Sequence, residues 1–166
     1  MEQPVFEQRL GELVEILPNV TVNETNFKVM YNWGTIEVLK NYLAKNPNAY
    51  PLVWLVPTKV KHNYTQRTCK SRCTIVIATK SNKQHEFNGY IYDTDYKLIL
   101  NVVDDNLIKA LHKAGISNIE FEYDSQKEPN YLVTLNEKQS PIDTWNATFL
   151  DLEIEFNANC LRPIIF

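Results

Sequence analysis

Residues 50–79 read YPLVWLVPTKVKHNYTQRTCKSRCTIVIAT, and this stretch decides the fold. Its first part is a strand-length block of apolar, β-branched and aromatic residues between Pro51 and Pro57, which predicts a strand buried on both faces. After a polar connection, residues 67–79 repeat with the two-residue period of a second, much longer strand. The two runs therefore predict a hairpin or a pair of adjacent strands.

The long strand has two unlike halves. Residues 74–78 are apolar on both faces, whereas residues 67–72 are polar and basic. A domain of 166 residues is too small to cover such a strand along its whole length, so we expect residues 58–73 to project from the core as an arm. An arm of this kind usually contacts another chain, which is the first indication of assembly.

Three other segments have the three- and four-residue spacing of amphipathic helices. The first begins near Pro4 and ends at Pro18, and the second is capped by Thr35. The third starts at residue 93 or 94 and ends near Ala114, with residues 104–106 as a point where it could break into two pieces. These helices flank the strand pair on both sides along the chain.

Short alternating pieces predict further strands. One lies within residues 19–32, two more at residues 119–123 and 131–135 flank a turn at 126–130, and a long one covers residues 144–160. All 166 residues are therefore expected to form a single α+β domain. Its sheet would be mainly antiparallel, with a projecting long hairpin and two to three helices packed on one face.

The periodicity also predicts the core, because each of the following residues lies at the apolar phase of its strand or helix. They are Leu52, Val53, Leu55, Ile75, Ile77, Leu100, Val103, Leu107, Leu111, Leu152, Ile154 and Phe156. We expect all of them to be buried.

Composition narrows the possible functions. Only 4 glycines argue against phosphate-binding loops, and a net charge of −3 argues against a global basic field for nucleic acid. Cys69 and Cys73 share a strand face about 13 Å apart, too far for a disulfide, and the histidines are scattered. We therefore expect free thiols, a reducing compartment, and neither metal nor cofactor. The N-terminus lacks the features of a signal peptide and no segment reaches membrane-span length, so no membrane partner is expected.

Four carboxylates form the constellation that most resembles acid–base chemistry: Asp93, Asp95, Asp104 and Asp105. The first two also suit the start of a helix, where the macrodipole favours negative charge, and the last two suit a solvated kink. The sequence contains no nucleophile elbow, phosphate loop, dinucleotide fingerprint or zinc-protease motif. It therefore favours no catalytic residue.

Opposite charges concentrate in two segments, a basic set on the arm and an acidic set on the wet face of the last strand. They are Lys59, Lys61, Arg67, Lys70 and Arg72 on the arm, and Asp151, Glu153 and Glu155 on the strand. We predict that the two sets form a subunit interface. The alternatives are a solvated hairpin, a solvated strand face, and contact of the arm with DNA phosphates.

The order of motifs resembles a known family. After a short N-terminal helix come YPLVWL at residues 50–55, CTIVIATK at 73–80 and a helix with YKLILN at 96–101. The last strand opens with DTWNA at residues 143–147 and continues to LEIEF at 152–156. This order resembles small virion proteins of tailed bacteriophages, of the tail terminator or tail completion kind, in particular those of phages of gut Bacteroidales. The likeness covers most of the chain, and its motifs are patterns rather than chemistry.

The resemblance implies a structural virion protein without catalysis or cofactor, whose subunits close into a ring at the phage neck or tail. Such a ring joins or caps tail components, and it would reside in the virion, or in the host cytoplasm during assembly. Its partners would be copies of itself and other neck or tail proteins, with nucleic acid touched only where the ring lines a DNA channel. Two other classes stay open: a small hydrolase or nucleotide-modifying enzyme that uses the acidic cluster, and an intracellular adaptor that is monomeric until a partner arrives.

Overall fold

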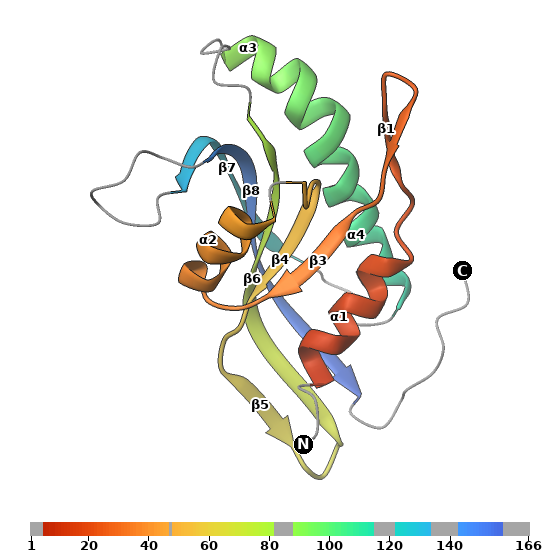
Figure 1. Ribbon diagram of the computed structural model, residues 1–166. Coiled ribbons are helices and arrows are strands. Elements are labelled where there is room, and N and C mark those ends of the chain that lie inside the picture. The colour runs from red at the N-terminus through yellow and green to blue at the C-terminus, as the bar shows by residue number, and fades with distance from the viewer. Residues whose placement is uncertain (1–4, 47, 82–87, 115–121, 134–142, 158–166) are drawn as a thin grey trace.

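The structure is a computed structural model, which describes residues 5–46, 48–81, 88–114, 122–133 and 143–157. The elements follow in the order α1 (Val5–Glu15), β1 (Val20–Val22), β2 (Thr25–Phe27), β3 (Met30–Trp33), α2 (Ile36–Lys45), β4 (Leu52–Val56), β5 (Val60–Asn63), β6 (Thr68–Lys80), α3 (Asn88–Ile91), η1 (Tyr92–Leu100), α4 (Asn101–Lys113), β7 (Tyr123–Val133) and β8 (Asp143–Asn157). Figure 1 shows them as a central sheet with helices on both sides. None of the helices in these ranges is both long and apolar enough to cross a membrane.

The six-stranded sheet has the order β3-β4-β6-β8-β7, and β5 pairs with the end of β6 that β4 leaves free. Strands β3 and β4 are parallel, and the other described pairs are antiparallel. The two strands predicted from residues 50–79 are β4 and β6, and they are adjacent at the centre of the sheet. The α+β class and the mainly antiparallel sheet are thus confirmed.

The two faces of β4 belong to two hydrophobic clusters. Val53 and Leu55 lie under α1, η1 and α4 in the larger cluster, whereas Leu52 and Trp54 face α2 in the smaller one. Two of the predicted helices, α1 and the continuous stretch of η1 and α4, therefore cover one face as expected. The remaining one, α2, lies on the other face. The reason is the parallel β3–α2–β4 unit, in which a right-handed crossover fixes the side on which the connecting helix packs.

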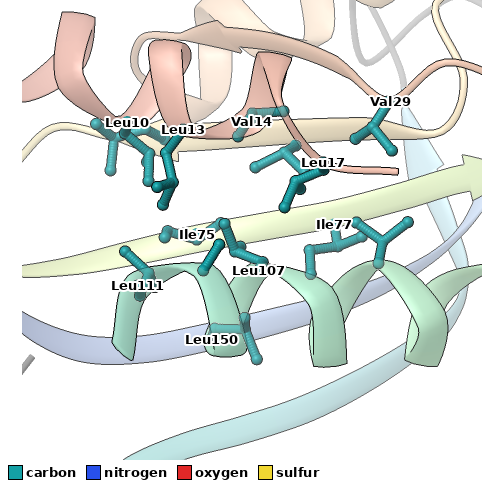
Figure 2. Packing of buried hydrophobic residues seen from close by; sticks show 14 of the residues in the cluster. Leu10, Leu13, Val14, Leu17, Val29, Ile75, Ile77, Leu107, Leu111 and Leu150 are labelled. Carbon is teal, nitrogen blue, oxygen red and sulfur yellow. The ribbon is translucent and has the colours of Figure 1, made fainter. Parts of the chain in front are cut away.

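The predicted core is confirmed wherever the structure describes it. Eleven of the twelve residues expected to be buried have at most 2% of their surface exposed. The side chain of the twelfth, Phe156, lies outside the described residues. Figure 2 shows how α1 and α4 press leucines against Ile75 and Ile77 of β6 from one side of the sheet.

The third helix differs from the expectation in where it begins and in where its winding changes. Helical structure is already present at Asn88, ahead of the predicted start at residue 93 or 94. The sequence suggested a break at residues 104–106, but α4 continues through them without interruption. The irregular winding lies upstream, where the backbone N–H of Asn101 donates to the carbonyl of Tyr96 across the wide turn of a π-helix. Val103 and Leu107, which flank residues 104–106, are buried in the core, and this packing stabilises a regular helix through the predicted break.

The segment predicted as two short strands around a turn is a single strand. Instead of turning at residues 126–130, β7 pairs with β8 from Tyr123 to Val133. Pro129 sits where a β-bulge between Glu128 and Tyr131 interrupts the ladder, and an edge strand tolerates proline at such a bulge. Three predicted pieces lie outside the described residues: 119–121 and 134–135 of the two short strands, and 158–160 of the last strand.

The phenol of Tyr96 ties the wide helical turn to the sheet, and its removal should cost stability. Its hydroxyl donates to the carbonyl of Ala147 at 3.0 Å, and the side chain is buried. Tyr96→Phe should lower the free energy of unfolding by about 1–2 kcal/mol, because the carbonyl loses a buried partner. Urea denaturation measures the loss. Tyr92→Phe, whose ring stacks on Tyr96 but is 44% exposed, is the control and should change stability by less than about 0.5 kcal/mol.

Candidate assembly interface

The arm is the hairpin of β5 and the adjoining half of β6, which extends beyond the helices at the lower end of Figure 1. At its turn the Asn63 side chain accepts from the backbone N–H of Gln66 at 3.0 Å, and at its base the Thr58 and Ser71 hydroxyls are 2.8 Å apart. β8 runs beside β6 as far as Asn157, so the arm is a three-stranded extension of the sheet rather than a free hairpin. The side chain of Tyr64 at the turn is 96% exposed.

The predicted contact between the basic arm and the acidic strand occurs within one chain. β6 and β8 are neighbours in the sheet, with Arg72 directly opposite Glu153 and Lys70 directly opposite Glu155. Lys70 Nζ lies 2.7 Å from Glu153 Oε1, and this hydrogen bond raises the pKa of Lys70. Lys70 and Glu153, one member of each charged set, thus neutralise each other within the chain. Their role at a subunit interface stays a prediction.

The outer basic residues have no such partner. Lys59 precedes β5 and Lys61 lies within it, and neither has an ion pair among the described residues. Lys61 stands directly opposite Lys70, and cross-strand pairs of like charge are destabilising. Lys59, Lys61, Lys70 and Arg72 line a hollow of about 340 Å³, to which Thr58 and Glu153 also contribute. We call Lys59 and Lys61 the cationic edge. Arg67, the fifth predicted residue, is exposed at the arm's turn with a positive φ of 54°.

The other edge of this sheet face, formed by β7, is acidic. Glu122 precedes β7 and Asp124 lies within it, and Asp124 stands directly opposite Asp151 of β8. Together with Arg72, Tyr123, Asp151, Leu152 and Glu153 they line a hollow of about 660 Å³. Thr74 donates its hydroxyl to Asp151 at 2.6 Å. We call Glu122 and Asp124 the anionic edge.

Sequence reasoning missed the anionic edge. Glu122 lies inside the strand predicted for residues 119–123, and Asp124 lies just beyond it. The sequence therefore does not place the two side chains on one face. Their alternation could have joined them to Asp151 and Glu153 only if one continuous strand had been placed beside β8. That pairing is a long-range contact that local patterning does not contain.

The two edges are too far apart to neutralise each other within the chain. The strands β6 and β8 lie between β5 and β7, which makes three inter-strand steps, or about 14 Å at the usual spacing. Solvent-exposed charges at that separation are largely screened, because the Debye length is about 8 Å at physiological ionic strength. One face of the sheet is therefore basic at one edge and acidic at the other.

The four carboxylates of the enzyme alternative do not converge. Asp93 and Asp105 are exposed, whereas Asp95 accepts a hydrogen bond from the Asn146 side-chain amide. Asp104 lies nine residues beyond Asp95 on the same helical stretch, a rise on the order of 13 Å. These positions do not form a paired acid–base site. The two structural expectations for the carboxylates are also wrong, because Asp93 and Asp95 lie within a helical stretch that extends back to Asn88, and Asp104 and Asp105 lie in the uninterrupted helix α4.

Asp104 is half-buried, and one of its carboxylate oxygens has no hydrogen-bond partner within the described part of the chain. Burial, with the neighbouring charge of Asp105, raises the pKa of Asp104 to about 6, while Lys127 opposes the shift. A carboxyl whose pKa is raised in the fold binds its proton more tightly there than in the unfolded chain. Its contribution to stability is present below the unfolded pKa, near 3.9, and is lost as the pH rises through about 6.

Replacing Asp104 by asparagine should therefore stabilise the protein at neutral pH. We expect Asp104→Asn to raise the free energy of unfolding by about 1 kcal/mol at pH 7.5, a value reduced from the full shift because the site is partly solvent-screened. The gain should disappear near pH 4, where the wild-type carboxyl is protonated. Urea denaturation at both pH values tests this. Asp93→Asn, on an exposed part of the same helical stretch, should show no comparable pH-dependent gain.

The two cysteines of the arm strand are free and buried. Burial, with the nearby charge of Asp151, raises the pKa of Cys73 to about 12, so its thiol stays protonated and unreactive at neutral pH. Cys69 Sγ lies 3.2 Å from Nδ1 of His62, its cross-strand partner. Sequence spacing did not show this pair because the hairpin register creates it. Within the described residues, no three histidine, cysteine, aspartate or glutamate side chains are placed to hold a metal ion.

No protein-family model matches the sequence, and no curated protein matches it.

Proposed function

We propose that this chain is a non-enzymatic structural protein at the neck or tail of a tailed bacteriophage. Copies of the chain would form a ring that joins or caps tail components, in the virion and in the host cytoplasm during assembly. The partners are other copies of the chain and the neighbouring neck or tail proteins. Nucleic acid is contacted only where the ring lines a DNA channel.

One observation carries the proposal: the sheet ends in an arm beyond the core, and the face that continues onto the arm is basic at one edge and acidic at the other. A heterologous contact, in which one patch meets a different patch of the next copy, is the kind that generates rings. The resemblance of the motif order to tail terminator and tail completion proteins supports the same function. The separated positions of Asp93, Asp95 and Asp104 weigh against the hydrolase or nucleotide-modifying alternative.

Composition of the purified phage particle tests the proposal. Quantitative mass spectrometry of particles from the phage that carries this gene should find the chain at a small, fixed number of copies per particle. Absence of the chain from tailed, infectious particles would contradict a structural function. Particles lacking the chain should accumulate as unjoined heads and tails, or as tails of abnormal length. Normal infectivity of such particles would contradict a joining or capping function.

A further inference from the structure

The charge on the exposed sheet face follows the strand order. Counted across the sheet at the arm, Lys59 and Lys61 come first with β5, and then Lys70 and Arg72 in β6. Asp151, Glu153 and Glu155 follow in β8, and Glu122 and Asp124 come last with β7. Only the middle of this series is neutralised within the chain, by the ion pair of Lys70 with Glu153 among the described residues.

Each half of the series contains a cross-strand pair of like charge. Lys61 faces Lys70, and Asp124 faces Asp151. Like charges directly opposite each other in a sheet are destabilising. Lys70 has Glu153 as an ion-pair partner, whereas Lys61 and Asp124 have no ion pair among the described residues, so each edge can accept opposite charge from another molecule.

The complementary charge for each edge is present on the other edge of the same molecule. We propose that the cationic edge of one copy lies beside the anionic edge of the next copy, so that Lys59 and Lys61 contact Glu122 and Asp124 between chains. This inference rests on the proposed function and names the surfaces through which the copies meet. The contact repeats between copies the arrangement that β6 and β8 show within one copy, where Lys70 reaches Glu153 on the neighbouring strand at 2.7 Å.

The signs of the edges also select the kind of contact. Two cationic edges repel each other, and so do two anionic edges, so charge disfavours the edge-to-edge contacts that join identical surfaces. The permitted contact joins unlike surfaces and is therefore heterologous, which makes rings where the rotation closes. Charged residues on exposed edge strands also prevent unspecific strand pairing, so the same side chains exclude wrong partners.

Charge reversal on each edge, followed by mixing, tests the inference. One variant carries Lys59→Glu with Lys61→Glu, and the other carries Glu122→Lys with Asp124→Lys. Each variant then has two edges of the same sign, and we expect its self-association to be about tenfold weaker or more, measured by sedimentation velocity of the full chain at low salt. An equal mixture of the two variants should assemble again, because every edge of one finds an opposite edge on the other.

The mixture separates this contact from effects within the chain, since a damaged fold cannot be repaired by adding a second damaged chain. Thermal unfolding of each variant should show no large loss of stability, because all four side chains are exposed and none has an ion pair among the described residues. The control matched to the Lys59 and Lys61 variant is Lys109→Glu with Lys113→Glu, which makes the same change of net charge on exposed positions of α4 and should leave assembly unchanged.

The inference is overturned if both variants assemble like the wild type, if the mixture stays dissociated, or if the wild-type chain remains monomeric at low salt. It is also overturned if the cationic edge binds duplex DNA and its reversal abolishes that binding while the oligomeric state is unchanged. In each of these cases the proposed function is still tested independently, by whether the chain is present in purified phage particles. Assembly of the wild type and of the mixture, with dissociation of each variant alone, supports both.

Discussion

Replacing Trp54 by alanine should lower the free energy of unfolding by about 3–5 kcal/mol, a large part of the 5–15 kcal/mol that holds a typical domain together. The indole is 1% exposed at the centre of the cluster beneath α2, and its Nε1 donates to the carbonyl of Gly34 at 2.8 Å. Its ring also packs on Tyr42, with centroids 5.4 Å apart. Truncation removes the packing and leaves the carbonyl without its buried donor.

Urea denaturation at neutral pH measures this loss, and Trp33 supplies the matched control. Trp33 lies on the neighbouring strand β3 and is 41% exposed, so Trp33→Ala should cost about 1 kcal/mol or less. Equal losses for the two variants would mean that α2 does not cover Trp54 as the structure places it.

Replacing Leu111 by alanine should cost about 2–5 kcal/mol. Leu111 is 1% exposed on α4 and belongs to the larger cluster, where leucines of α1 and isoleucines of β6 surround it (Figure 2). The spread in the expected cost reflects how far the neighbours can close the cavity that the missing side chain leaves.

Val102 on the same helix is 37% exposed and supplies the control. Val102→Ala should change the free energy of unfolding by less than about 1 kcal/mol. If Leu111→Ala proved as mild as Val102→Ala, the assignment of the buried face of α4 would be wrong.

Local pattern was sufficient to predict the centre of this fold. The strand β4 is apolar on both faces and β6 alternates over most of its length, so burial left a signal in the sequence itself. The stripe that ends at Leu111 likewise fixed the buried face of α4. In these elements the packing against the sheet and the intrinsic preference of the residues agree.

The elements at the edges of the sheet could not be predicted in the same way. Every described side chain of β7 from Tyr123 to Lys127 is exposed, so the sequence has no alternation of apolar and polar residues that would predict a strand there. Pro129 also suggests a turn. The strand exists because it pairs with β8, which is a long-range contact. The side on which α2 packs similarly depends on the parallel pairing of β3 with β4.

The sequence predicts the charges of the candidate interface, but it does not predict which strands pair and so which charges lie side by side. Composition and position were enough to predict a basic arm and an acidic last strand. The adjacency of β6 and β8 pairs Lys70 with Glu153 within the chain, and it leaves the charges at the two outer edges without an ion pair among the described residues. Only the register of β7 places Glu122 and Asp124 on the same face as Asp151, where they join the candidate interface.

Zero-length cross-linking with a carbodiimide tests the assembly most directly, because this reagent joins a lysine amine to a carboxylate only when the two are in contact. Lys70 and Glu153, 2.7 Å apart in one chain, provide the internal positive control. The strands that carry the cationic and anionic edges of one chain are about 14 Å apart, with the side chains of β6 and β8 between them, so we expect a link between the edges to join two chains. In assembled material we expect links from Lys59 or Lys61 to Glu122 or Asp124 beside the Lys70–Glu153 link. Abundant Lys70–Glu153 links without any link between the edges would contradict the contact.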